Sequence, residues 1–260
     1  MDAPTTATVN VTIRFNRFLP YWAVLQTDLR QTVRSWVYRL WVLMVLAAAA
    51  GSVVYKIGAQ REAGIVQAAS VQTGDLLRGL VAVSLALVAL LAVGSVSSER
   101  STAADAILSR GISRHQYFLA KLHARVVVVL VTFAALATVV LLAHHFLFDS
   151  DLSLTGGFAA VVMVAAVLLV VVSWGVTIGA LSNGTVIGIT LFWLALYGGI
   201  FLLSLLPEPY PTPDRVLARL KFVLRGQYDP AIVTQMVAAS AVLSGLAAAV
   251  GLVGFSRRDV

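Results

Sequence analysis

Six long apolar runs dominate the pattern of hydrophobic and polar positions along this chain. Each run is close to the roughly 20 residues that a helix needs to cross about 30 Å of hydrocarbon. They lie at about residues 37–55, 76–96, 126–147, 158–181, 185–206 and 231–255. The pattern therefore predicts an all-α polytopic membrane protein with six transmembrane helices.

A shorter amphipathic segment precedes the first run. From Pro20, apolar side chains recur at intervals of three and four residues, which is the spacing of one helix face. That face holds Trp22, Leu25, Leu29, Val33 and Trp36, and the other face holds Gln26, Asp28, Arg30, Gln31 and Arg34. We expect residues 1–36 to form a tail and an interfacial elbow helix, and residues 37–260 to form one transmembrane domain of six helices. Packing on a soluble domain is the alternative, but the chain offers no such domain.

The longest polar, cationic segment between two apolar runs is residues 98–125. Residues 102–108 read as a short helix that Arg110 and Gly111 end. Ser113, followed three residues later by Gln116, has the spacing of a capping box, which starts a second helix leading into the third apolar run. We therefore expect a short helix across the membrane face, a bend and a spanning helix, and such a segment is suited to contact with another protein.

Two further features lie between the later runs. Ser182, Asn183 and Gly184 form a turn signal that predicts a tight hairpin of two antiparallel helices. Residues 213–225 carry apolar side chains on one helical face and cations elsewhere, with a helix end at Gly226. They predict a short basic amphipathic helix on the outer surface, although Phe222 falls on its polar side.

Charge and composition set the environment and the orientation. The chain has 260 residues, 59% of them hydrophobic and 12% charged, with a net charge of +7. Lys and Arg flank the apolar runs and are more numerous on the side that holds the N-terminus. We therefore expect a multi-pass protein of the plasma (inner) membrane with both termini in the cytoplasm, in contact with anionic lipid and not with nucleic acid. The N-terminus shows no pattern of a cleaved signal peptide.

The cationic segment also resembles a known family. Glu99, a small/Thr pair at Ser101 and Thr102, the run 107–114, the aromatic pair Tyr117 and Phe118, and residues 120–122 resemble the first cytoplasmic loop of ABC type-2 exporter permeases. Two positions depart from that pattern. In the family a Gly is common before the Thr, where this chain has Ser101. A Pro often follows the Ser-Arg pair, where this chain has Gly111.

The resemblance implies a function and partners. In that family the loop is a coupling helix that docks on a separate ATP-hydrolysing subunit, and the permease works as a pair of identical or related chains. The ATPase-coupling residues that it implies here are Glu99, Arg110, Gly111, Ser113, Arg114 and Lys121. ATP and magnesium would then be bound by the partner, which agrees with the absence of a G-x-x-x-x-G-K-[ST] motif from this chain. The family also has an N-terminal elbow and outer insertions between its last two spans.

The sequence offers little for chemistry in the chain itself. It has no cysteine, and we identify no catalytic, cofactor-binding or metal-binding residues. Adjacent His144 and His145 point about 100° apart on a helix, so we interpret them as interfacial side chains and not as haem or metal ligands. Gly175 and Gly179 favour close helix contact.

Three functional classes are left. An ATP-driven exporter subunit follows from the resemblance. A non-transporting membrane scaffold is one alternative, and a secondary transporter or channel is another. The apolar runs have no Asp, Glu, Lys or His near their centres, which argues against ion-coupled transport. Their apolar lining favours a lipid-like, peptidic or otherwise amphipathic cargo.

Overall fold

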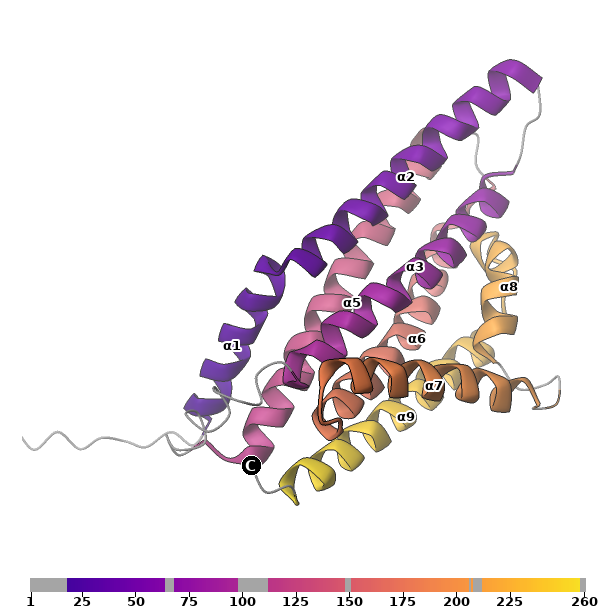
Figure 1. Ribbon diagram of the computed structural model, residues 1–260. Coiled ribbons are helices and arrows are strands. Elements are labelled where there is room, and N and C mark those ends of the chain that lie inside the picture. The colour runs from indigo at the N-terminus through magenta and orange to yellow at the C-terminus, as the bar shows by residue number, and fades with distance from the viewer. Residues whose placement is uncertain are drawn as a thin grey trace, which may run out of the picture.

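The computed structural model of the chain describes residues 18–63, 68–97, 112–147, 151–205, 207 and 212–257. Within these residues it contains helices and no strand (Figure 1). The helices are α1 (Leu19–Arg34), α2 (Trp36–Ala63), α3 (Ala69–Ser97), α5 (Arg114–Leu147), α6 (Leu154–Leu181), α7 (Thr185–Ser204), α8 (Pro213–Leu224) and α9 (Pro230–Ser256). Six of them, α2, α3, α5, α6, α7 and α9, are long and apolar enough to cross a membrane. The predicted fold class is therefore confirmed.

Helix α6 occupies the centre of the bundle. It packs against α3, α5 and α9 and is buried along most of its length. Gly175 and Gly179 make this close packing possible, because a Cβ at Gly175 would lie 2.7 Å from the Cβ of Ala92 and one at Gly179 would overlap the backbone of Val93. The predicted close helix contact at these glycines is thus observed, and its partner is α3.

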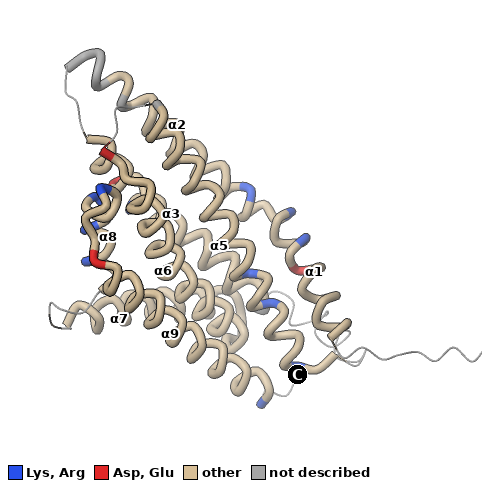
Figure 2. The backbone as a smooth tube through the Cα atoms, turned by 180° about the vertical axis from the view of Figure 1, so that it is seen from behind, with Lys and Arg blue, Asp and Glu red and all other residues tan. Residues whose placement is uncertain are grey.

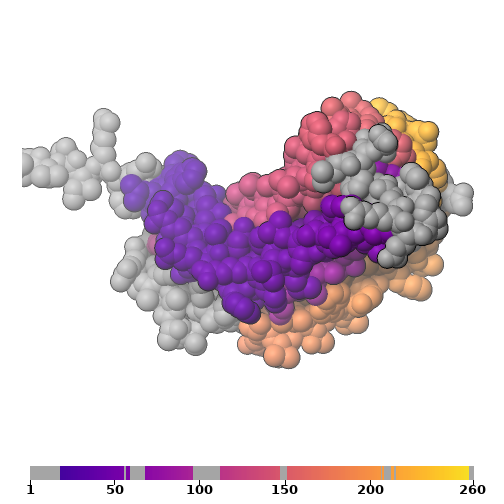
Figure 3. All heavy atoms as spheres, turned by 90° about the horizontal axis from the view of Figure 1, so that it is seen from above, coloured from indigo at the N-terminus to yellow at the C-terminus, as the bar shows by residue number. Residues whose placement is uncertain are grey.

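Helices α2 and α7 lie on the outside of the bundle. Among its described residues α7 buries only Gly188 and Phe192. In the view from above, the side of α1 and α2 that is coloured indigo and purple is not covered by other helices (Figure 3). Helices α2 and α7 therefore expose apolar side chains, such as Leu43 on α2 and Leu194 on α7, that can contact lipid or another protein.

Two helices begin earlier than the apolar runs suggest. Helix α3 starts at Ala69 and not near Leu76, so Arg78 lies inside the helix. Helix α5 starts at Arg114, and its capping box is confirmed: the Ser113 amide donates to Gln116 Oε1 (3.3 Å) and the Gln116 amide donates to Ser113 Oγ (3.2 Å). With 34 residues, α5 is about 51 Å long and exceeds the thickness of the hydrocarbon.

Charged residues gather at the two ends of the bundle. Figure 2 shows them on α1 and the adjoining part of α5, and again around α8, with a mostly uncharged region between. One end holds the C-terminal end of α3, the first turns of α5 and the end of α9, and we call it the junction end. The predicted turn Ser182 to Gly184 also lies between helices there, joining α6 to α7.

Helix α8 packs on the opposite end of the bundle, against α3 and α6. Val216, Leu220, Val223 and Leu224 are buried, whereas Phe222 is 43% exposed, so the predicted apolar face and its one misfit are both observed. Gly226 ends the helix with a φ of 81°, a conformation that favours glycine.

A polar contact fixes α8 to the start of α3. Asp151 Oδ1 accepts from the Ser70 amide (2.9 Å), and its Oδ2 accepts from Ser70 Oγ (2.6 Å) and Arg225 Nε (2.8 Å). Burial alone would raise the pKa of Asp151, but the hydrogen bonds from Ser70 and Arg225 outweigh it, so its pKa lies below the ordinary value.

The predicted helix before the first span exists as α1. It is separated from α2 by Ser35, whose extended ψ of 145° breaks the helical path. Instead of standing apart, α1 packs against the first turns of α5, with Leu25 against Ala120 and Ala124. Its position in the membrane interface stays a prediction.

Candidate functional site

The residues predicted to meet an ATPase divide into two groups. Glu99, Arg110 and Gly111 lie outside the described residues, as does the short helix expected at 102–108. Ser113, Arg114 and Lys121 are described and belong to the start of α5. The site can therefore be built from the two ends of the segment 98–111, which are the last turn of α3 and the first turns of α5.

Lys121 is buried inside the chain, with only 2% of its surface exposed. Its Nζ donates to Asp28 Oδ1 on α1 (3.2 Å) and to the carbonyl oxygen of Ser95 on α3 (2.8 Å), and it lies 5.3 Å from the centre of the Tyr117 ring. One ammonium group thus joins α5 to both α1 and α3. The assignment of Lys121 to ATPase coupling stays a prediction, and the structure shows its charged group enclosed within the chain.

Arg125 follows one helical turn later and faces the same side. Its Nη2 donates to Asp28 Oδ1 (3.2 Å), and its Nη1 donates to Thr32 Oγ1. Asp28 and Thr32 are four residues apart on α1, as Lys121 and Arg125 are on α5, so both pairs face each other across the contact. We call Asp28, Thr32, Ser95, Lys121 and Arg125 the junction.

The junction is almost free of solvent. Asp28 is 3% exposed and Arg125 is 8% exposed. Charges held in a low-dielectric interior need partners, because removing one partner leaves an uncompensated buried charge. Asp28 Oδ2 has no hydrogen-bond partner among the described groups, so the carboxylate is held through Oδ1 alone in that set.

The aromatic pair at the start of α5 fixes this helix to α9. The rings of Tyr117 and Phe118 each lie 6.1 Å from the ring of Phe255, centre to centre. Gly251 gives Phe118 its space, since a Cβ at this position would overlap the ring. Arg114 Nη1 also donates to the carbonyl oxygen of Ser256 (3.4 Å).

These contacts therefore connect four helices around the two ends of the segment 98–111. We call the last turn of α3 and the first turns of α5 the two roots of this segment. Lys121, on the α5 root, donates to the carbonyl oxygen of Ser95 on the α3 root, so its ammonium group joins the two roots. Helix α1 enters through Asp28 and α9 enters through Phe255. A displacement of either root would be transmitted to all four helices.

Sequence reasoning did not identify Asp28 as a member of the site. It assigned Asp28 to the polar face of an interfacial helix, because its partners are more than 90 residues away in sequence. One signal was present: Asp28 is the only acidic residue between Leu19 and Arg34, a segment that otherwise carries cations. A lone acid there, together with two cations one turn apart on α5, is a pattern typical of a buried contact.

Other residues with ligand chemistry are occupied elsewhere. His144 is buried at the end opposite the junction, with Nδ1 2.6 Å from Thr73 Oγ1. In the described part of the chain, no group of three or more His, Cys, Asp or Glu residues could hold a metal ion. The histidine pair thus joins α5 to α3 through His144.

The junction can hold helices together and transmit movement, and it presents no arrangement for bond chemistry. Comparison with known proteins adds no family to this description, since no protein-family model and no curated protein sequence matches the chain.

Proposed function

We propose that this chain is the membrane-spanning permease subunit of an ATP-driven exporter of the ABC type-2 kind. The observation that supports it most is the junction, which ties both ends of the segment 98–111 to α1, together with the contact of Tyr117 with Phe255 on α9. A segment that receives force from another protein requires such a rigid connection to the spanning helices. The resemblance of its residues to the family's coupling loop gives the proposal its specific form.

Movement would pass through the junction in two steps. An ATPase closing on ATP would push on the segment 98–111, which connects α3 to α5. Because Lys121 bridges these helices and Asp28 ties them to α1, the push would displace α3, α5 and α1 together. The spanning helices would then switch between two packings, as in other interface-driven transitions.

The predicted coupling residues take different roles in this proposal. Glu99, Arg110 and Arg114 would make the charged contacts with the ATPase, and Gly111 would allow the bend between the two helices. Ser113 would define the start of α5 through its capping box. Lys121 would act inside the chain by holding the roots of the loop in register.

The remaining parts of the machine would come from partners. ATP and magnesium would be bound by the ATPase subunit, and a second permease copy or homologue would complete the transport path. The exposed apolar surfaces of α2 and α7 are available for such a copy or for lipid. An amphipathic cargo suits the apolar spans.

Co-purification tests the proposal. The full chain is isolated from membranes of its host, and associated proteins are identified by mass spectrometry. We expect an ABC ATPase to be retained by the unaltered chain and lost, together with stimulated ATP hydrolysis, from a variant carrying Glu99→Lys and Arg114→Glu.

The control reverses one cation at the other end, as Arg114→Glu does at the junction end. Arg219→Glu alters an exposed cation on α8 and should leave the ATPase bound. Retention of the ATPase with full activity by the Glu99 and Arg114 variant would reject the assigned contacts. Isolation of a stable assembly without any ATPase would favour the scaffold alternative.

A further inference from the structure

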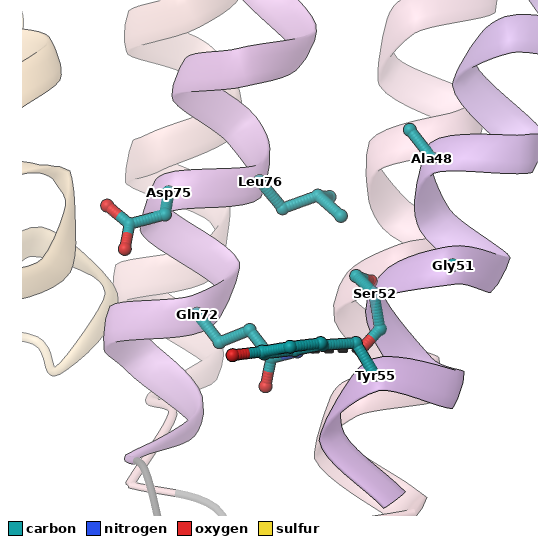
Figure 4. A pocket seen from close by; sticks show the side chains of 7 residues that line it. All are labelled: Ala48, Gly51, Ser52, Tyr55, Gln72, Asp75 and Leu76. Carbon is teal, nitrogen blue, oxygen red and sulfur yellow. Dashed lines mark hydrogen bonds between the residues drawn. The ribbon is translucent and has the colours of Figure 1, made fainter. Parts of the chain in front are cut away.

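A groove opens between α2 and α3 at the end of the bundle opposite the junction. It encloses about 500 Å³. Its lining, drawn in Figure 4, comprises Ala48, Gly51, Ser52, Tyr55, Gln72, Asp75 and Leu76. This volume lies in the range of small-molecule sites, which is about 300–1,000 Å³.

Gln72 gives the groove a directed polar group. Its side chain extends from α3 toward α2 beside Tyr55 (Figure 4), and the residue is only 9% exposed. Its Nε2 donates to the carbonyl oxygen of Ser52 (2.7 Å), which assigns the orientation of the amide. The Oε1 atom has no hydrogen-bond partner among the described groups. A buried acceptor of this kind favours a ligand that donates a hydrogen bond.

The rest of the lining also presents acceptors. The carbonyl oxygen of Ser52 accepts from Gln72, and its hydroxyl donates to the Ala49 carbonyl oxygen (2.7 Å) and keeps lone pairs that can accept. Among the side chains that the structure describes around the groove, none is Lys, Arg or His. In Figure 4 the carboxylate of Asp75 points away from the groove, to the other side of α3, so the polar group directed into the groove is that of Gln72. The lining therefore disfavours phosphate or sulfate groups and favours a positively charged donor.

The apolar side of the groove indicates what the donor is attached to. Ala48 and Leu76 line it further into the bundle than Tyr55, which is the last residue of the first candidate span. The polar part thus lies where the hydrophobic run ends and the apolar part lies along the run. Tyr55 also supplies an aromatic ring, which attracts cations.

We propose that this groove binds an amphipathic amine, with its ammonium group donating to Gln72 Oε1 beside Tyr55 and its alkyl chain lying along Ala48 and Leu76. The ammonium could belong to an aminophospholipid of the bilayer or to a free amphiphile. Both share the chemistry that the groove recognises. The inference uses only contacts within this chain and does not depend on the proposed ATPase partner.

A direct binding measurement tests the site. The full chain is reconstituted in nanodiscs of phosphatidylcholine, and binding of radiolabelled dodecylamine is measured. Dodecanol and dodecyl sulfate serve as competitors that lack the positive charge. We expect saturable binding of dodecylamine and at least about tenfold weaker competition by the alcohol and the sulfate.

Two variants and one control locate the binding. Gly51→Leu fills the groove, and a Cβ at this position meets no atom within 4 Å, so the fold can accept it. Gln72→Leu removes the acceptor. Each should weaken binding about tenfold or more, whereas Gly79→Leu, on an exposed part of α3 with equal open space, should leave binding unchanged.

The outcomes separate the sources of the ammonium from failure of the site. Competition by phosphatidylethanolamine added to the nanodiscs assigns the site to a lipid head group, and lack of competition assigns it to free amphiphiles. Equal binding by Gly51→Leu and the unaltered chain, or equal competition by dodecyl sulfate, would overturn the proposal. Isolation of the unaltered chain without an ATPase, with amine binding intact, would instead reject only the proposed function.

Discussion

Buried polar side chains, each with a partner far away in the sequence, define the contacts between helices at the residue scale. Asp28 meets Lys121, Gln72 meets Ser52, and His144 meets Thr73. Burying such a group without a partner costs free energy, so the bonds that these side chains do form specify which helix faces meet. The apolar residues around them supply burial but little directional information.

Replacing Asp28 should release α1 from α5. In Asp28→Asn, Lys121 and Arg125 lose their shared anion, and we expect the docking of α1 to weaken by about 3 kcal/mol. Hydrogen exchange of the α1 amides should then become faster, and the melting temperature should fall. Arg30→Gln, an exposed change on the same helix, should alter neither quantity. Unchanged exchange in Asp28→Asn would contradict the junction.

Residue partners were the part of the site that the sequence could not reveal. The capping box of Ser113 and Gln116 was predictable, because both groups lie within one turn. The pairing of Asp28 with Lys121 depends on the packing of α1 along α5, which no local pattern specifies. Gln72 was likewise not predicted as a site residue. It lies in the first turns of α3, before the apolar run from which this helix was predicted.

At the scale of elements, α8 combines a buried apolar face with one polar contact at its C-terminal end. The Asp151 carboxylate joins the start of α3 to the C-terminal end of α8 through Ser70 and Arg225. Asp151 and Arg225 are each about a third exposed, so solvent screens their attraction. The contact orients α8, whereas its buried apolar face supplies most of the adhesion.

Acid should loosen this contact. The pKa of Asp151 is lowered in the folded chain from its usual 3.8, so its stabilisation is present above that pH and is lost as the pH falls through the folded value. We expect a change of at most about 1 kcal/mol because the pair is partly exposed. Hydrogen exchange of α8 below pH 4 measures it. Asp151→Asn should show faster exchange at neutral pH and lack this acid-dependent step.

Close packing of α3 on α6 should tolerate no side chain at Gly179. The Cβ of Gly179→Ala would overlap the backbone of Val93, so the helices must separate, at an expected cost of about 1–3 kcal/mol. Gly198→Ala on α7 is the matched change, since nothing lies within 4 Å of its Cβ and alanine favours a helix. A lower melting temperature for the first variant only is expected, and equal temperatures would contradict the packing.

Element existence was more predictable than element length. The six apolar runs identified all six spans, because about 20 apolar residues in succession are a local property. The starts of α3 and α5 lie before their apolar runs, since their polar first turns are stabilised by other helices. The pattern of apolar and polar residues in α1 predicts an amphipathic helix, but it does not predict that this helix packs against α5.

The whole molecule combines a central helix with two differently built ends. Helix α6 is enclosed by its neighbours. At one end the junction joins α1, α3 and α5, and Phe255 of α9 packs beside it; α8 covers the other end. The proposed function requires the junction end to face the cytoplasm, where an ATPase can reach the segment 98–111. The proposed amine groove then opens near the outer face.

Orientation of the segment 98–111 is the most direct test of this account. The chain has no cysteine, so a single cysteine replacing Ser109, or Gln227 at the other end, can be labelled selectively. With a membrane-impermeant maleimide on intact cells, we expect Gln227→Cys to react and Ser109→Cys to react only after the membrane is opened. Labelling of Ser109→Cys from outside intact cells would contradict the account.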